Sequence, residues 1–153
     1  PDARIILHGV SMGAATVLMA SGETLPENVK AVIADCGYTS EWDEFIWEAE
    51  TLHIPWFPVL NAASALSKLR DGYDFKQASA LEQVKKSDIP TLFIHGTADE
   101  LVPYKMLGEL FSAAACEKES LTVEGAGHAL SSSVEPEMYW STVERFVEKY
   151  IGS

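Results

Sequence analysis

The sequence has few cysteines, few basic residues and no long hydrophobic run, and each shortage excludes a class of protein. Cys36 and Cys116 are too few for a disulfide framework, so we expect both to be reduced core residues. No apolar run reaches the roughly 18 residues that a membrane span needs, and no membrane contact is expected from this segment. Lysine and arginine total 11 against 23 acidic residues, with no basic cluster beyond Lys85-Lys86, which argues against nucleic acid as a partner.

Cofactor-binding motifs are absent too. There is no Walker-type loop and no G-x-G-x-x-G loop, and His8, His53 and His95 do not have a metal-ligand spacing. We therefore expect no cofactor and no metal. His8 and His95 each precede a glycine at a strand end and are expected to pack or hydrogen-bond near the site that forms there. No signal peptide is visible, and the expected compartment is the cytoplasm.

The residues that are present have the pattern of one α/β domain. Apolar residues make up 47% of 153 residues, enough for a core. Their alternation of strand-like runs and helical spacing predicts a parallel sheet with flanking helices. The expected strands are Arg4–His8, Val29–Ala34, Thr91–His95 and Leu121–Val123. Two later helices are also expected: one begins with Pro103 at its first helical position, and the last lies near Pro136–Ile151.

A long excursion separates the second and third predicted strands. Ser40 is the expected N-cap of its first helix, a second helical pattern covers residues 59–69, and Gly72 is the expected stop. Ser79 and Glu82 have the spacing of a capping box for a third helix. Five aromatic residues of the excursion either form its own small core or line an apolar pocket for an acyl or aromatic group: Trp42, Phe45, Trp47, Trp56 and Phe57.

The stretch "RIILHGVSMGAATVLMA", residues 4–20, passes from a buried strand directly into a helix. Ser11 lies at the junction, bracketed by Gly9 and Gly13. Small residues on both sides let strand and helix approach closely, and a serine held in such a turn exposes its hydroxyl. This is the G-x-S-x-G nucleophile elbow.

Two further polar residues follow later strands in the order Ser, Asp, His. Asp99 comes after the third strand, in "HGTADELVP", and His128 after the fourth, in "VEGAGHA". A serine hydroxyl needs a base to remove its proton, and the imidazole needs a carboxylate to fix its tautomer. Asp35, after the second strand, stays an alternative acid, and Cys36 an alternative nucleophile without a basic neighbour in sequence.

Four segments carry a family resemblance: "LHGVSMGAATV", "ADCGYTS", "LFIHGTADELVP" and "GAGHA". Over essentially its whole length the chain resembles the carboxyl-terminal part of an α/β-hydrolase-fold serine hydrolase, of the bacterial esterase and acylpeptidase-like branch. The resemblance implies Ser11 as nucleophile, Asp99 as acid, His128 as base and the backbone N–H of Met12 as an oxyanion donor. It also implies that residues 1–153 are a partial hydrolase domain, with an inserted helical cap at about 39–88.

The family has further strands before the elbow strand, and the loop that supplies its second oxyanion donor lies there. This sequence does not contain that loop, so we expect a fragment with an incomplete active site. Its first strand would then be an open edge that pairs with a second copy or with a separate amino-terminal segment.

The expected function is hydrolysis of carboxylic esters or small acyl compounds through an acyl-enzyme, with a small acyl molecule as substrate. A peptidase or amidase of the same fold is the alternative among enzymes, because these enzymes share the triad chemistry. A non-catalytic fragment, or a subunit of a split hydrolase, is the alternative outside enzymes.

Overall fold

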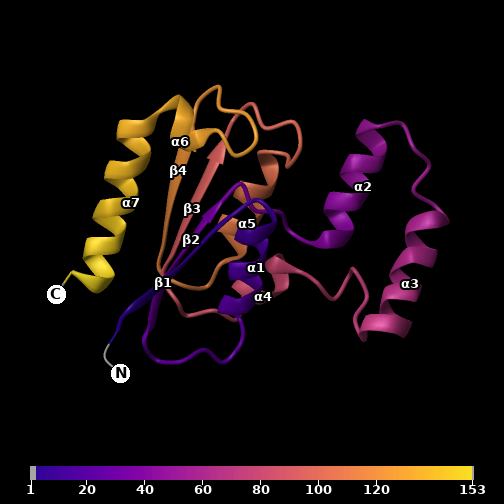
Figure 1. Ribbon diagram of the computed structural model, residues 1–153, viewed down its shortest axis with the longest axis horizontal. Coiled ribbons are helices and arrows are strands. Elements are labelled where there is room, and N and C mark those ends of the chain that lie inside the picture. Colours follow the sequence, from indigo (N-terminus) through magenta and orange to yellow (C-terminus); the bar gives the residue numbers. More distant parts are fainter. Residues whose placement is uncertain (1–2, 153) are drawn as a thin grey trace.

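The structure, a computed structural model, describes residues 3–152, and its centre is a parallel sheet. Within these residues the sheet has four strands in the order β1 (Ile5–Val10), β2 (Val29–Asp35), β3 (Thr91–Gly96) and β4 (Lys118–Val123). Each strand pairs in parallel with the next, so all four carboxyl ends meet at one edge of the sheet (Figure 1). The predicted α/β fold with a parallel sheet is confirmed.

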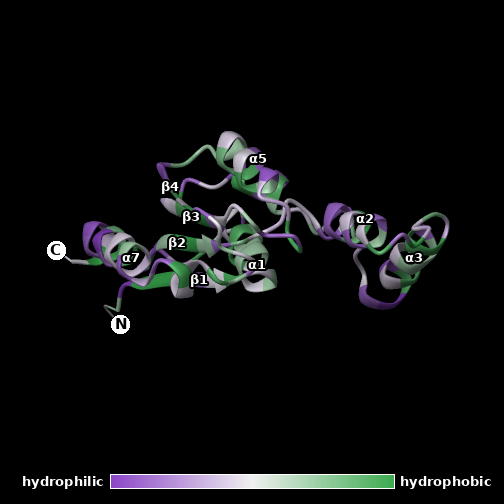
Figure 2. Ribbon diagram, turned by 90° about the horizontal axis from the view of Figure 1, so that it is seen from above, coloured by the Kyte–Doolittle hydropathy of each residue, from purple (hydrophilic) through white to green (hydrophobic). Residues whose placement is uncertain are grey.

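Helices cover both faces of this sheet. On one face α1 (Met12–Ser21), α4 (Ala80–Val84) and α5 (Lys105–Ala113) pack around Phe93. On the other face α7 (Pro136–Ile151) packs its Phe146 against the strands. Figure 2 shows the hydrophobic strands between α7 on one side and α1 and α5 on the other. Every residue of β3 is buried, which agrees with the unbroken apolar run at its centre, residues 92–94.

Two helices, α2 (Glu41–Thr51) and α3 (Val59–Asp71), extend away from the sheet and form what we call the α2–α3 unit (Figure 1). The predicted caps are present: the Ser40 hydroxyl accepts a hydrogen bond from the Asp43 amide at 3.0 Å, and Gly72 ends α3 with a φ of 86°. The unit is joined to the sheet where Ser40 and Ser79 form an antiparallel bridge.

The prediction that Pro103 begins a helix is wrong. α5 begins at Lys105, after Tyr104 as N-cap, and Pro103 belongs to the preceding turn, where its carbonyl accepts from the Met106 amide at 2.9 Å. The Asp99 carboxylate holds the start of this turn by accepting from two backbone amides, and the helix therefore starts later. A short helix that sequence reasoning missed, α6 (Ser131–Val134), follows His128. Among residues 3–152, no helix has the length and apolar character that crossing a membrane requires.

Candidate active site

Ser11 lies in a strained turn between β1 and α1. Its φ of 56° is in the left-handed region that residues other than glycine rarely adopt. A Cβ on Gly9 would lie 2.1 Å from the carbonyl oxygen of Gly13, so the close approach of strand and helix requires glycine at position 9. A Cβ on Gly13 would meet nothing within 4 Å. The Ser11 amide also donates to the Asp35 carbonyl at 2.8 Å, which fixes the turn against β2.

His128 lies between Ser11 and Asp99 and contacts both. Its Nε2 is 2.8 Å from the Ser11 hydroxyl oxygen, and its Nδ1 is 2.9 Å from Oδ2 of Asp99. An ionised carboxylate can only accept hydrogen bonds, so the imidazole proton is on Nδ1 and Nε2 offers its lone pair to the serine hydroxyl. The structure thus brings together three side chains that are 88 and 29 residues apart in sequence, and it aligns them for proton transfer.

Asp99 is buried, and four hydrogen-bond donors surround its carboxylate. Oδ1 accepts from the amides of Leu101 and Val102 at 3.0 and 2.9 Å, and Oδ2 faces His128 and the ring of His95, whose Nε2 lies 3.2 Å away. Burial alone would raise the pKa of Asp99, but the hydrogen bonds from His95, His128 and Val102 outweigh it and lower that pKa. The carboxylate is therefore ionised at neutral pH.

His95 makes a contact with Asp99 that could not be read from sequence. Its Nε2 lies 3.0 Å from the Val102 carbonyl oxygen as well as near Asp99, and a carbonyl can only accept, so this nitrogen carries a proton. His95 is therefore a second ring, beside His128, that contacts Oδ2 of Asp99. The sequence signal was its position before Gly96 at a strand end, which predicts a place near the site but no partner.

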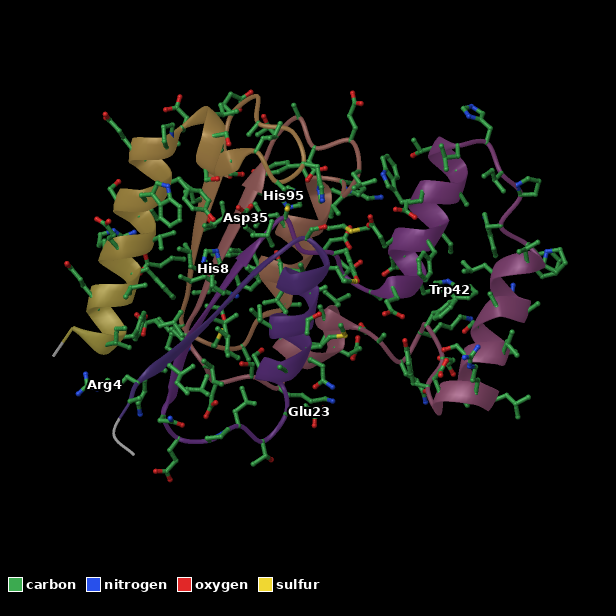
Figure 3. The ribbon with its side chains drawn as sticks, in the orientation of Figure 1. Arg4, His8, Glu23, Asp35, Trp42 and His95 are labelled. Carbon is green, nitrogen blue, oxygen red and sulfur yellow. The ribbon has the colours of Figure 1, made fainter. Side chains whose placement is uncertain are left out.

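Asp35 and Cys36, the two alternatives, lie close by without taking part in this chain of contacts. Figure 3 shows Asp35 between His8 and His95 near the carboxyl edge of the sheet. Oδ1 of Asp35 is buried without a hydrogen-bond partner, and burial raises the pKa of this carboxyl. Cys36 is buried, and burial followed by the Asp35 charge raises the pKa of its thiol to about 12. A thiol with that pKa is protonated at neutral pH and is a weak nucleophile.

Cys36, Asp99 and His128 are also the residues that could reach a metal ion, because their ligand atoms lie within 4.8 Å of one another. The protonated thiol and the existing bond between His128 and Asp99 both oppose this, since a metal would have to displace the shared proton and a second one from sulfur. The donor set fits proton transfer better than metal binding.

A small cavity of about 210 Å³ opens beside Ser11. Its floor comes from the elbow, and its far wall comes from α2 and from the loop after β3. Met12, the first residue of α1, has a backbone N–H without a partner inside the helix and is 70% exposed. The lining residues are Ser11, Met12, Tyr38, Glu41, Glu44, Phe45, Glu48 and Leu101.

The five predicted aromatic residues do not all line this cavity. Phe45 lines the cavity beside Ser11 and, with Trp56, a separate apolar cavity of about 340 Å³ between α2 and α3. Trp42, labelled in Figure 3, packs edge-on against Trp56 with ring centroids 6.3 Å apart. Trp47 donates from its indole to the Glu100 carbonyl at 3.2 Å, and Phe57 is 67% exposed. Of the five, only Phe45 lines the cavity that contains Ser11.

The sequence of this chain matches a known protein family and a curated relative. The model of the prolyl oligopeptidase family matches residues 2–153. The uncharacterized protein YqkD of Bacillus subtilis is 29% identical over 143 residues, covering 93% of this chain and 47% of that protein. The chain thus spans about half the length of this curated relative.

Solved structures agree on the fold. The acylaminoacyl peptidase of Pyrococcus horikoshii superposes with a TM-score of 0.71 at 18% identity, over 99% of this chain and 25% of that one. The esterase domain of a Rhodothermus marinus protein gives a TM-score of 0.64 at 24% identity, over 95% of this chain and 60% of that one. The predicted resemblance to a carboxyl-terminal part of an α/β-hydrolase is confirmed.

Proposed function

The chain belongs to the prolyl oligopeptidase family, and on this basis we propose that it carries the catalytic residues of a serine hydrolase acting on carboxylic esters or small acyl compounds. The observation that carries the proposal is the continuous chain of hydrogen bonds from Ser11 through His128 to Asp99. Each link has the length that proton transfer needs before any substrate is bound.

The proposed reaction has two halves. Ser11 Oγ attacks the acyl carbon while His128 Nε2 takes the hydroxyl proton, and Asp99 stabilises the imidazolium that forms. His128 then gives that proton to the departing alcohol oxygen, which leaves an ester between the acyl group and Ser11. A water molecule, deprotonated by His128, attacks this ester and releases the acid, and the proton returns to Ser11. No cofactor takes part.

The negative oxygen of the tetrahedral intermediate needs donors, and the Met12 N–H is the one that the elbow supplies. It begins α1, where the helix dipole adds a partial positive charge. In a characterised serine protease the loss of one such donor costs about 10²–10³ in turnover. The Met12 N–H would therefore contribute a rate factor of about that size in this proposal.

The α2–α3 unit, in residues 39–88, serves in this proposal as the cap over the acyl site. Phe45 is its aromatic contact with the cavity beside Ser11, and Trp42 and Trp56 pack against each other inside the unit. Peptide or amide hydrolysis is the second candidate, which the match to a peptidase family favours. The same triad would serve, with an amine in place of the alcohol as leaving group.

A fluorophosphonate probe tests the assignment of the nucleophile. We expect mass spectrometry to place the label on Ser11 and expect Ser11→Ala to abolish it, while Ser112→Ala, an exposed serine on α5, leaves labelling unchanged. Labelling elsewhere with Ser11 unmodified would reject the nucleophile. A protein that takes no label and hydrolyses no p-nitrophenyl ester or anilide would instead support the non-catalytic alternative.

A further inference from the structure

Three glutamates of α2 face the cavity that contains Ser11. Glu41, Glu44 and Glu48 have the spacing i, i+3, i+7, which places them on one side of the helix. Like charges at such spacings repel one another and destabilise a helix. Among residues 3–152, none of the ion pairs involves any of the three. The wall of the cavity is thus acidic and lacks a compensating positive charge.

Glu44 carries the inference, because its side chain is buried without being satisfied. The residue is 7% exposed, and its Oε2 is buried without a hydrogen-bond partner. Burial, then the nearby charges of Glu48 and Asp99, raise the pKa of Glu44 to about 7. Leaving a buried polar group unpaired costs free energy, so an unpaired carboxylate beside a nucleophile indicates that something else pairs with it.

The position of α2 does not explain this arrangement by itself. The helix dipole stabilises acidic residues in a first helical turn, which accounts for the presence of glutamate at positions 41 and 44. It does not account for Glu48, which lies two turns into the helix, or for the burial of Glu44. Tyr38 supplies no positive charge to offset the glutamates, because burial and the charges of Glu41 and Glu44 raise its pKa to about 12 and its hydroxyl is neutral.

The chemistry of the cavity favours an ammonium group over a metal ion. In residues 3–152, the three glutamates do not bring their oxygens close enough together to form a metal-binding group. An ammonium group needs no such convergence, because each of its N–H bonds can meet a separate acceptor. The cavity of about 210 Å³ is smaller than the roughly 300–1,000 Å³ of drug-sized sites, so the group it holds is small.

We propose that Glu44, with Glu41 and Glu48, forms a subsite for a protonated amino group, and that the substrate is a small acyl compound carrying such a group near its scissile carbonyl. The inference rests on the proposed function, since it names the substrate class of the same site. Met12, Phe45 and Leu101 supply the apolar part of the cavity, which contacts the carbon skeleton between the amine and the reacting carbon.

Pairs of isosteric substrates test the proposal in the protein that contains this chain. The p-nitrophenyl esters of alanine and isobutyrate differ by an ammonium in place of a methyl group on the acyl side. The butyrate esters of ethanolamine and propanol place the same difference on the leaving group. We expect kcat/KM to favour the amine in one pair by about tenfold to a hundredfold, the worth of a charged hydrogen bond, and the pair that responds locates the amine.

Glu44→Gln should remove most of this preference, and Glu48→Gln should lower it in the same direction. Glu50→Gln is the matched control, because it makes the same change at an exposed position of α2 outside the cavity and should leave the ratio unaltered. No preference in either pair, or a preference that survives in Glu44→Gln, would overturn the subsite.

A binding experiment separates failure of the subsite from failure of the catalytic proposal. Alaninamide and isobutyramide are titrated into the protein, and the amide NMR signals of Ser11 and Glu44 are followed. Selective shifts by alaninamide that Glu44→Gln removes support the subsite even where no ester is hydrolysed. Equal responses to the two amides contradict the subsite, whatever the outcome of Ser11 labelling.

Discussion

Replacing Asp99 by asparagine removes one charge and turns one oxygen into an NH₂ group, and the surrounding donors decide which oxygen is lost. The amides of Leu101 and Val102 both donate to Oδ1 and are fixed by the backbone, so the asparagine keeps its carbonyl oxygen there. Its NH₂ group then takes the place of Oδ2 and faces the ring nitrogens of His128 and His95.

This orientation forces the wrong tautomer on His128. Nδ1 of His128 must accept from the new NH₂ group, so the ring proton moves to Nε2 and points at the Ser11 hydroxyl, where no base is left. His95 cannot adjust in the same way, because the Val102 carbonyl keeps its Nε2 protonated. The equivalent change in a serine protease lowers kcat by about 10⁴, or about 5 kcal/mol, and we expect a loss of that order here.

The assay compares kcat for a p-nitrophenyl ester, and the rate of fluorophosphonate labelling of Ser11, in Asp99→Asn and Asp35→Asn. Both variants neutralise a buried carboxyl at the same edge of the sheet, and only Asp99 contacts His128. We expect labelling and turnover to fall together in Asp99→Asn and to change little in Asp35→Asn. Near wild-type rates in a folded Asp99→Asn protein, or a larger loss in Asp35→Asn, would refute the tautomer argument.

Three further predictions follow from the structure. Gly9→Ala should lower thermal stability markedly, because the new Cβ would overlap the Gly13 carbonyl, whereas Gly13→Ala should be tolerated in melting experiments. The pKa of Glu44 is raised to about 7, so the folded state binds this proton more tightly than the unfolded state does. As the pH rises from about 4.5 to 7, the free energy of unfolding of the wild type should therefore fall relative to that of Glu44→Gln, by at most about 3 kcal/mol in chemical denaturation. The groups that face Glu44 are Glu41, Glu48, Tyr38 and Asp99. The chain by itself should self-associate through β1, which pairs only with β2 among the described strands, and a monomer by light scattering at high concentration would contradict this.

Local sequence determined much of this protein. The apolar runs marked the two central strands, β2 and β3, because strands buried on both faces need continuous apolar residues. Ser40, Gly72 and Ser79 set helix ends through contacts within a few residues. The glycine-bounded Ser11 likewise marks its own turn, since the close approach of strand and helix is written in neighbouring residues. These features depend on short-range sterics and hydrogen bonds, which the sequence states directly.

Only the tertiary structure decided which distant side chains meet. Asp35 and Asp99 both follow strands and end at the same sheet edge, and the path of the loop after β3 determines that Asp99 contacts His128. The sequence placed His95 near the site but gave no sign of its contact with Asp99, which depends on the turn at Val102. Glu44 carried no local signal, because its place in the cavity depends on how α2 lies over the elbow. Such convergence follows from sheet twist and loop path over many residues, which no short motif records.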